Sequence, residues 1–381
     1  MKKPDYSGGS IVNLISSISS SCGMPSSYPD LRTSHLSDLQ DADNIVLLIV
    51  DGLGYNYLKK SGADTYLTRS LRDKMDSVFL SSTGSAITTF FTGVAPQQHA
   101  VTGWYVYLHE FGIVTRYLPF TNVADNHPLG IEISDTIDTP SLLPKLNRAA
   151  FSIQGNSIVD SVYSQFMAGS AARVGYDGLE DFFVKIKQAL SRPGKSYVHS
   201  YWPELDAIGH ILGMANAAAT DHLHTLDHSL QAFAEEIEGT STTLVVTGDH
   251  GFNDVLPPNM ESTLAHPGLL DCLTMPLCGD TRTSFCFVRP SRVESFERYV
   301  SKAFGEYCTL SKSQDLLDAG WFGLGDISPR LEKRVGDYTL IFKEGHALVN
   351  SFPGVQTHAL RGHHGGVSSD EMYVPLIVMK L

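Results

Sequence analysis

The sequence predicts an α/β protein built around a mostly parallel β-sheet. Residues 45–50 are six consecutive apolar residues, most of them β-branched, which is typical of a strand covered on both faces. Residues 40–110 follow the order strand, helix, strand, helix, and residues 139–255 resume this alternation. Strands that alternate with helices along the chain are the pattern of an α/β fold with a parallel sheet.

A change of pattern after residue 255 predicts a small α+β insertion. Its expected elements are a strand, an amphipathic helix and two further strands, at residues 284–288, 293–304, 308–310 and 338–342. We therefore divide the chain into the first part of a core, a cap insertion and the closing part of the core, at residues 1–255, 256–345 and 346–381.

The segment 104–138 is rich in aromatic residues and is expected to be irregular. It is interpreted as a lid or as the wall of a substrate site, with ordinary packing as the alternative for each single aromatic side chain.

Composition limits the class of function. The 381-residue chain is 42% hydrophobic, which is enough to bury a large core. Its length suits one large domain with insertions, or two domains. Its net charge of −13, without a basic stripe, disfavours a protein that binds nucleic-acid duplexes.

The cysteines and the first residues bear on localisation. Five cysteines without a Cys-x-x-Cys pair predict reduced thiols in a cytoplasmic protein rather than a disulfide framework. The N-terminal residues contain no apolar run that suits a signal peptide or a membrane span, so we expect no membrane association. Residues 11–15 suit a short helix, and residues 16–27 a serine-rich loop.

Acidic and imidazole side chains follow two of the predicted strands. Asp249 and His250 stand between glycines directly after a strand-like run, and together they offer oxygen and nitrogen ligands for a divalent metal. Asp51 follows residues 45–50, at the carboxyl edge where open α/β sheets bind their ligands. The alternative for Asp51 is a helix N-cap.

A third group lies further along the core. Asp206 and His210 are four residues apart, so one helical turn places both on the same face, where they suit a metal. Glu204 and His199 are interpreted as solvated or hydrogen-bonding residues. A neighbouring stretch is interpreted as an exposed polar face of a helix; its residues are Asp221, His222, His224, Asp227 and His228.

A fourth group is the pair His363-His364, which stands beside Gly365 and Gly366. Only one of these histidines is expected to bind a metal, because neighbouring side chains in an extended loop diverge.

A nucleophile is expected within residues 78–93, which read as a strand, a turn and a helix that ends at Gly93. A hydroxyl at the start of this helix is flanked by free backbone N–H groups and by the positive end of the helix dipole, which suits a phosphate. Ordinary capping by Ser82 or Thr83 is the alternative.

In this order the motifs resemble the alkaline phosphatase superfamily, and within it the type I phosphodiesterase/nucleotide pyrophosphatase family. The resemblance runs from about residue 45 to the C-terminus, and it rests on Asp51-Gly52, Thr83, Thr92-Gly93-Val94-Ala95-Pro96-Gln97-Gln98-His99, Asp206 with His210 and Gly213, Asp249-His250-Gly251 and His364-Gly365-Gly366. It implies an alkaline phosphatase-like three-layer sandwich with a mostly parallel central sheet and a small α+β cap.

The resemblance also implies two divalent metal ions, usually zinc, although manganese accepts similar donors. The ligands of one ion would be Asp51, Asp249, His250 and the hydroxyl oxygen of Thr83. Those of the other would be Asp206, His210 and His364.

Spacing relative to the family motifs selects among neighbouring residues. Thr83 is preferred to Ser82 as the nucleophile because it stands at the family's usual distance before Thr92, and His364 is preferred to His363 because it directly precedes the two glycines. His99 is expected to be structural.

The chain departs from the family pattern at Ala86, where animal-type members have an Asn that holds a phosphoryl oxygen. Stabilisation of the phosphoryl group is then expected from the metals, from the backbone N–H of Gly84, or from a group that the sequence does not identify. Arg282 and Arg334 could reach a phosphate, although a surface or salt-bridge role is favoured for each.

The sulfatase signature is absent around Thr83, which argues against sulfate esters.

These features predict a phosphohydrolase that cleaves phosphodiester or nucleotide pyrophosphate bonds through a phospho-threonine intermediate. The substrate is expected to be a small phosphate ester or nucleotide. Alternatives are a phosphomonoesterase or phosphonate hydrolase with the same site, and a catalytically silent nucleotide-binding protein. The sequence does not indicate the oligomeric state.

Overall fold

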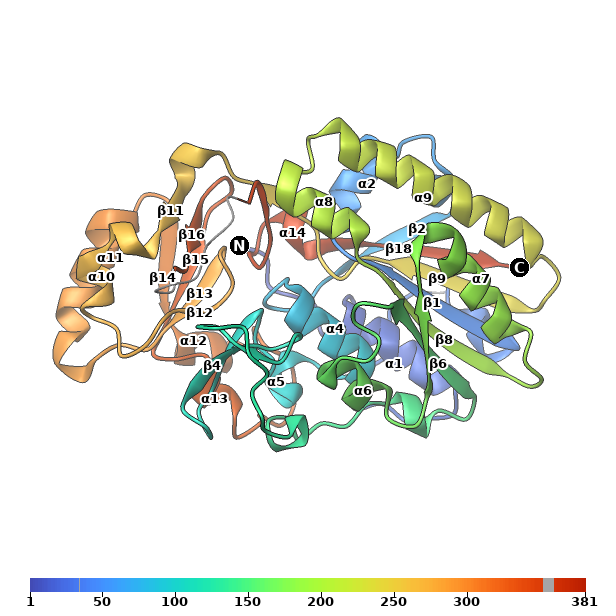
Figure 1. Ribbon diagram of the computed structural model, residues 1–381, viewed down its shortest axis with the longest axis horizontal. Coiled ribbons are helices and arrows are strands. Elements are labelled where there is room, and N and C mark those ends of the chain that lie inside the picture. The colour runs from blue at the N-terminus through green and yellow to red at the C-terminus, as the bar shows by residue number, and fades with distance from the viewer. Residues whose placement is uncertain (34, 352–359) are drawn as a thin grey trace.

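Two β-sheets lie at opposite ends of the molecule in the computed structural model, which describes residues 1–33, 35–351 and 360–381 (Figure 1). The first sheet has the strand order β2-β18-β9-β1-β8-β6-β7. The bounds of these strands, in that order, are Leu71–Asp76, Tyr373–Lys380, Thr242–Thr247, Asn44–Val50, Ser196–Trp202, Ala149–Gly155 and Ala172–Tyr176.

This first sheet is mostly parallel, as predicted. Strand β1 pairs in parallel with both β8 and β9, and β6 pairs in parallel with β7 and β8. Only β18 runs against its neighbours β2 and β9 among the strands of this sheet that the structure describes.

Helices cover both faces of the sheet, because each strand of its centre is apolar on both sides. Ile45, Leu47 and Ile49 of β1 pack on one face, in a core shared with α1, α4 and α6. Val46 and Val50 pack on the other face, in a core shared with α2, α7, α8 and α9. The three layers are visible in Figure 1, and the bounds of the helices are α1 Ile11–Ser21, α2 Tyr55–Ser61, α4 Thr83–Thr92, α6 Val162–Ala168, α7 Gly178–Leu190, α8 Glu204–Leu212 and α9 Ala217–Glu236.

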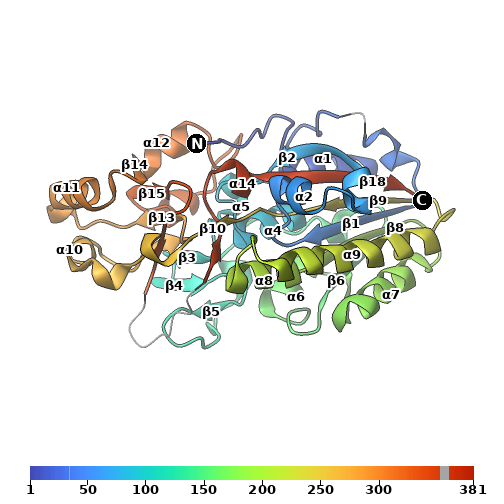
Figure 2. The same ribbon diagram turned by 90° about the horizontal axis from the view of Figure 1, so that it is seen from above.

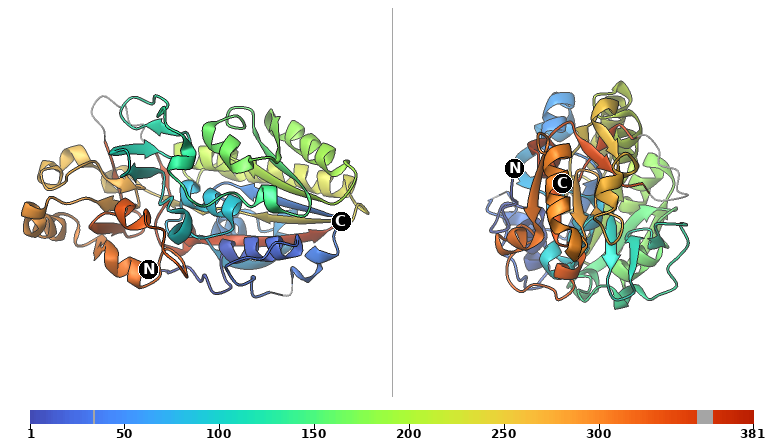
Figure 3. Two further views of the ribbon diagram at one scale, coloured as in Figure 1. Left: turned by 90° about the horizontal axis from the view of Figure 1, so that it is seen from below. Right: turned by 90° about the vertical axis from the view of Figure 1, so that its left-hand side faces the viewer.

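The second sheet has the strand order β14-β15-β13-β12-β3-β4-β5. Its strands, in that order, are Cys308–Lys312, Tyr338–Phe342, Thr283–Cys286, Cys278–Gly279, Tyr105–Leu108, Ile113–Arg116 and Thr121–Asn122. The amphipathic helix predicted after Pro290 is α11, Val293–Phe304, and the short helices α10, α12 and α13 are Pro267–Leu270, Ser313–Asp318 and Leu331–Arg334. The left panel of Figure 3 shows this sheet beside the parallel one.

The aromatic segment 104–138 is not irregular throughout, because it supplies β3, β4 and β5 to the second sheet. Gly279 of β12 pairs with Tyr105 of β3, so strands from two distant parts of the chain form one sheet. The second sheet therefore draws on the range predicted as cap and on the range predicted as core. The division into these three ranges itself stays a prediction.

The N-terminal helix is longer than expected. Helix α1 continues to Ser21, so residues 16–21 are helical rather than part of a loop. Ser16 and Ser19 are buried, and the Ser16 hydroxyl donates to the Tyr28 carbonyl. Polar side chains that find partners inside the protein allow a serine-rich sequence to remain helical.

Shorter elements complete the fold. They are α3 Tyr66–Arg69, α5 Pro96–His99 and α14 Ser369–Met372, with the strand pairs β10 Asn253–Asp254 with β17 Gly362–His363, and β11 Met260–Ser262 with β16 Ala347–Val349. Figure 2 shows β18 in red, running from α14 near the centre of the molecule to the C-terminus at the far end of the sheet.

The structure also bears on the predictions about the cysteines and about membrane spans. The five cysteines are free thiols, and all of them are buried. In the part of the chain that the structure describes, none of the helices combines the length and apolar character needed to span a membrane.

His199 of β8 differs from its expected solvated or hydrogen-bonding role. It is fully buried, its ring stacks on Phe91 with centroids 4.1 Å apart, and neither ring nitrogen has a hydrogen-bond partner among the described residues. Burial lowers the pKa of His199 from 6.5 to about 3, so the folded protein holds this ring neutral.

Replacing His199 with Phe is therefore expected to stabilise the protein in mild acid. Below pH 6.5 the unfolded chain binds a proton at His199 that the folded chain does not, so the wild type loses stability as the pH falls toward 3. One such proton is worth about 2 kcal/mol at pH 5 relative to pH 7. Urea unfolding of both proteins at pH 7 and pH 5 measures this difference. An equal gain at both pH values would show that packing, rather than protonation, explains the effect.

Candidate metal centre and active site

Three neighbouring strands deliver most of the candidate ligands to one edge of the parallel sheet. Asp51 follows β1, Asp249 and His250 follow β9, and Asp206 and His210 lie on α8, which begins after β8. Because these strands are parallel and adjacent, their carboxyl ends meet at the same edge. His364 reaches this edge from the loop before β18, since that strand runs in the opposite direction.

The first group of ligand atoms surrounds the Nε2 atom of His250. This nitrogen lies 3.4 Å from Asp51 Oδ1, 3.3 Å from Asp249 Oδ2 and 3.1 Å from Thr83 Oγ1. All four residues are buried. We call these four residues the His250 group.

The second group brings together Asp206, His210 and His364. His210 Nε2 lies 3.1 Å from His364 Nε2, and Asp206 Oδ1 lies 3.5 Å from the first of these nitrogens and 4.0 Å from the second. We call these three residues the His364 group. The two groups adjoin each other, since the ligand atoms of Asp206, His250 and His364 also lie within 4.8 Å of one another.

Both groups have dimensions that suit a metal ion. Two nitrogen or oxygen ligands of a tetrahedral zinc ion, each at about 2.0–2.1 Å from it, lie about 3.3 Å apart. The separations in the two groups scatter around this value. Three buried carboxylate oxygens, Asp51 Oδ1, Asp206 Oδ1 and Asp249 Oδ2, have no hydrogen-bond partner among the described residues. Buried carboxylate oxygens without donors are costly unless a cation neutralises them.

The pKa shifts of the site residues also favour a bound cation. Burial raises the pKa of Asp51 well above its usual value, and the charges of Asp206 and Asp249 raise it further. Burial also raises the pKa of Asp206. Burial and the neighbouring histidines lower the pKa of His364, which keeps its imidazole neutral as a metal ligand requires.

Thr83 is the first residue of α4, and its hydroxyl faces the His250 group. Ser82, the alternative nucleophile, is fully buried, and its hydroxyl donates to Asp280 Oδ2 over 2.7 Å. The geometry therefore favours Thr83. Gly84 follows at the second helical position, where its backbone N–H has no intrahelical acceptor. A Cβ at Gly84 would lie 2.3 Å from the Gly103 carbonyl oxygen, so close packing alone demands glycine there.

Several alternatives left open by the sequence are resolved by the positions of the side chains. Asp51 is not a helix N-cap, because α2 begins at Tyr55 with Gly54 as its cap. His363 and His364 diverge as expected: His363 Nδ1 lies 3.0 Å from Thr281 Oγ1. His99 is buried against Thr89, consistent with a structural role.

The polar stretch on α9 is only partly exposed. Asp221, His224 and His228 are exposed, whereas Asp227 is buried. Asp227 accepts hydrogen bonds from the backbone N–H groups of Tyr66 and Leu67. Its prediction as an exposed residue was wrong, because a carboxylate at the start of a neighbouring helix satisfies free N–H groups there.

Neither Arg282 nor Arg334 lines the candidate site. Both are fully buried, Arg282 in an ion pair with Glu371 and Arg334 in one with Glu110. The favoured salt-bridge role is therefore observed, in the interior rather than at the surface. Among the described residues that line the cavity next to Thr83, none is Lys or Arg.

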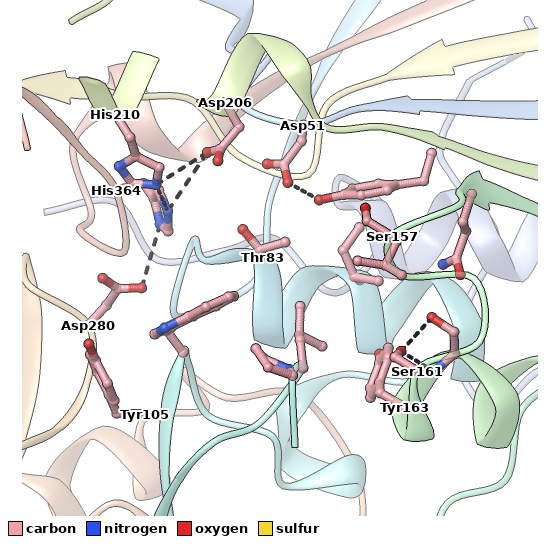
Figure 4. Close-up of a pocket in the computed structure, with 18 of the residues that line it drawn as sticks. Asp51, Thr83, Tyr105, Ser157, Ser161, Tyr163, Asp206, His210, Asp280 and His364 are labelled. Atoms are coloured by element: carbon pink, nitrogen blue, oxygen red, sulfur yellow. Dashed lines mark hydrogen bonds and ion pairs between the residues drawn. The ribbon is translucent and has the colours of Figure 1, made fainter. Parts of the chain in front are cut away.

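That cavity has a volume of about 590 Å³ and begins at the two ligand groups (Figure 4). Asp51, Thr83, Asp206, His210 and His364 lie at one end of it. Its remaining wall is mostly apolar and aromatic with a few hydroxyl groups, and it includes Trp104, Tyr105, Leu118, Ile158, Ser157, Ser161 and Tyr163. Trp104, Tyr105 and Leu118 come from the aromatic segment, which therefore forms a wall of the cavity.

Sequence reasoning did not find two residues at the site. Tyr201 of β8 donates its hydroxyl hydrogen bond to Asp51 Oδ2. Asp280, in the turn between β12 and β13, lies 3.6 Å from His364 Nδ1. The period-two pattern of β8, which places Tyr197, His199 and Tyr201 on one face, was a signal for the first. No local pattern indicated the second.

Comparison with known proteins identifies what the chain is similar to. The family model of type I phosphodiesterase/nucleotide pyrophosphatase matches residues 45–366. No curated protein matches the chain significantly. Among solved structures, murine ectonucleotide pyrophosphatase/phosphodiesterase 5 is 14% identical, with a TM-score of 0.66 and 87% of each chain covered. The human counterpart is 15% identical, with a TM-score of 0.66, covering 88% of this chain and 87% of the other.

An inactive variant of the murine protein has been solved in complex with AMP; it is 15% identical, with a TM-score of 0.65 and 87% of each chain covered. At these identities the likeness shows the fold. The predicted alkaline phosphatase-like arrangement of a mostly parallel sheet with helices in layers is confirmed.

Removal of divalent metal is expected to destabilise the protein, and Asp51→Asn is expected to reverse part of that loss. In the wild type, zinc at a hundredfold excess over its Kd should add about 2.7 kcal/mol of stability per site. In chelator, Asp51→Asn should melt above the wild type, because it removes one charge from the buried carboxylates. Thermal unfolding with chelator and with zinc measures both effects.

The matched control is Asp221→Asn, which removes a charge from an exposed position on α9. It should leave the response to zinc unchanged. A metal-free Asp51→Asn protein that melts below the metal-free wild type would contradict the electrostatic reading of the site.

Proposed function

The chain belongs to the type I phosphodiesterase/nucleotide pyrophosphatase family, a family of metal-dependent hydrolases of phosphoric ester bonds, and on that premise we propose that it cleaves phosphodiester or nucleotide pyrophosphate bonds with Thr83 as the nucleophile. The observation that carries this proposal is the position of Thr83. Its hydroxyl borders both the His250 group and a cavity large enough for an organic substituent on phosphorus.

In the proposed reaction, Thr83 Oγ1 attacks phosphorus and the bond to the leaving-group oxygen breaks. The product of this first step is a phospho-threonine that, for a diester substrate, keeps the remaining organic group on phosphorus; the Thr83 hydroxyl proton is lost to solvent and the leaving oxygen departs as an anion or takes up a proton from solvent. Water then attacks the same phosphorus, the bond to Thr83 Oγ1 breaks, and the Thr83 hydroxyl is regenerated. Such two-step displacement replaces one difficult hydrolysis by two easier transfers. The backbone N–H groups at the start of α4 would donate to the phosphoryl oxygens, since they have no intrahelical acceptors.

The residues present suit two divalent cations. The His250 group would hold one ion and the His364 group the other, and the mixed imidazole and carboxylate donors favour zinc over manganese. When bound, such ions lower the pKa of a coordinated hydroxyl and neutralise charge on the phosphoryl oxygens. This contribution matters here, because Ala86 lacks a hydrogen-bond donor and no described Lys or Arg lines the cavity.

The shape and lining of the cavity support a diester rather than a monoester substrate. A phosphate monoester needs only the end of the cavity that contains Thr83 and the ligand groups. The aromatic and hydroxyl-bearing wall beyond it offers a site for an uncharged organic group, such as a nucleoside. The AMP complex of the murine relative supports a nucleotide substrate.

We also propose that the protein functions in the cytoplasm. Its five buried free thiols support a reducing environment, because none of them is joined in a disulfide.

Thr83→Val is expected to lower kcat for bis-p-nitrophenyl phosphate by about 10⁴-fold or more, since it removes the nucleophile while keeping the shape of the side chain. Thr83→Ser keeps a hydroxyl and should retain measurable turnover. Steady-state rates, with metal content determined for each variant, make the comparison. If Ser82→Ala abolishes turnover while Thr83→Val retains it, the nucleophile is Ser82.

Substrate preference separates the candidate reactions. We expect kcat/KM to fall in the order thymidine 5′-monophosphate p-nitrophenyl ester, bis-p-nitrophenyl phosphate, p-nitrophenyl phosphate, because only the diesters place an organic group in the cavity. A preference for the monoester would assign the protein as a phosphatase. Tight AMP binding without turnover of any ester in the metal-loaded protein would indicate a silent nucleotide-binding protein.

A further inference from the structure

A three-residue turn of the second sheet contacts the loop that carries His364. The turn is Asp280-Thr281-Arg282, between β12 and β13, and we call it the clamp turn. The loop is residues 363–366, which precede α14 and β18 of the first sheet. Each of the three consecutive side chains of the clamp turn contacts this loop or the residue that holds it.

Arg282 fixes the loop from its C-terminal side. Its Nε and Nη2 atoms each donate to Glu371 over 3.0 Å, and both residues are fully buried. Glu371 Oε1 accepts in turn from the backbone N–H of Gly366 over 2.9 Å. A buried bidentate ion pair of this kind has a defined geometry, so it restricts where the backbone of Gly366 can lie.

Thr281 and Asp280 contact the two histidines directly. Thr281 Oγ1 lies 3.0 Å from His363 Nδ1, and Asp280 Oδ2 lies 3.6 Å from His364 Nδ1. The same oxygen of Asp280 accepts from Ser82 Oγ over 2.7 Å. Figure 4 shows His364 between Asp206 on one side and Asp280 on the other.

The backbone of the loop is shaped around Asp280. Gly365 has a φ of +92°, and a Cβ there would lie 2.6 Å from the Cβ of Asp280. From the side of the first sheet, the Ser81 carbonyl accepts from the N–H of Gly365, and the Ser81 hydroxyl donates to the Gly366 carbonyl. The loop is therefore held between the segment before Thr83 and the clamp turn.

Each of the three histidines of the two ligand groups has a protein oxygen near Nδ1. His250 Nδ1 lies 3.1 Å from the Gly251 carbonyl oxygen, and His210 Nδ1 lies 2.9 Å from the Gly362 carbonyl oxygen. An oxygen acceptor at Nδ1 directs Nε2 of each ring toward the ligand groups. For His364 the oxygen near Nδ1 is Asp280 Oδ2, at 3.6 Å, which is longer than a hydrogen bond and leaves Nδ1 without a hydrogen-bond partner among the described residues.

We propose that Asp280 is a positioning residue that orients the His364 ring, with Nδ1 toward its own carboxylate and Nε2 toward Asp206 and His210, and so sets the affinity of the His364 group for a divalent cation. The proposal rests on the proposed function only in taking His364 as a metal ligand. Thr281 and Arg282 hold the backbone on either side. The second sheet thereby completes a metal site whose ligands all come from the first sheet and its helices.

Asp280→Asn tests the proposal, because it keeps the size of the side chain and an acceptor for Ser82 but removes the charge that faces His364. Competition with a chromophoric chelator measures zinc binding to both sites of the purified full chain. We expect one of the two zinc ions to bind about 10–100-fold more weakly, and the other with an unchanged Kd. Wild-type affinity at both sites would overturn the proposal.

Asp337→Asn is the matched control. Asp337 is the residue before β15 of the same sheet; its carboxylate accepts from the Val288 backbone N–H, and it does not line the cavity with Thr83. It should leave both zinc affinities unchanged, even where it lowers stability. A loss of affinity equal to that of Asp280→Asn would show that any damage to this sheet weakens the site, and would overturn a specific role of Asp280.

A spectroscopic measurement observes the wild type directly and uses a variant only to assign the signal. In the zinc-loaded protein, His364 Nδ1–H should give a downfield proton signal that exchanges slowly, assigned by its loss in His364→Gln. A fast-exchanging proton there would contradict the contact with Asp280. Because neither measurement uses a substrate, a protein that fails to cleave any diester can still confirm or overturn this role.

Discussion

The crowding of carboxylates at one sheet edge is the constraint on which the site depends. Asp51, Asp206 and Asp249 are held there by β1, α8 and β9, and the burial of these groups leaves an oxygen of each without a donor. Burying three like charges opposes folding unless cations neutralise them. The parallel strands that create the edge also make this placement unavoidable, since their carboxyl ends all face the same way.

The rest of the site is arranged to meet that constraint. Imidazoles from α8, from the loop after β9 and from the loop before β18 place ring nitrogens opposite the carboxylates, within 3.3–4.0 Å. Helix α4 begins beside them, so the Thr83 hydroxyl and the free N–H groups of the first turn share the space where charge concentrates. The second sheet closes the cavity with aromatic side chains and supplies Asp280 to the histidine loop.

The sequence predicted those parts of the site that follow from strand ends and helix periodicity. Asp51 and Asp249 were found because each follows a continuous apolar run, and the spacing of Asp206 and His210 placed both on one helix face. These residues lie together in the structure, and their roles as ligands stay a prediction. The layered fold could be predicted in the same way, because alternating strands and helices leave few arrangements open.

Contacts between distant segments could not be predicted. Nothing near Asp280 indicates that β12 pairs with β3, and that pairing is what builds the sheet that carries Asp280 to His364. The helical serines of α1 and the buried Asp227 were missed for the same reason, since their partners lie on other elements. The local sequence indicates which residues favour a helix or a strand. The hydrogen-bond partners of a buried polar side chain, in contrast, depend on the whole fold.

The metal ligands and the substrate cavity are built by different parts of the molecule. The ligand groups and Thr83 are fixed by the first sheet, which is the part that the sequence pattern specifies most directly. Part of the cavity wall, including Trp104, Tyr105 and Leu118, and the clamp turn come from segments 104–122 and 278–286, which pair with each other in the second sheet. Changes in that sheet can therefore alter the organic group that fits beside phosphorus without moving Thr83. The same changes can affect the metal ligands through Asp280 and its neighbours. These residues contact the loop 363–366, which carries His364 and is also bonded to Ser81 beside the first sheet.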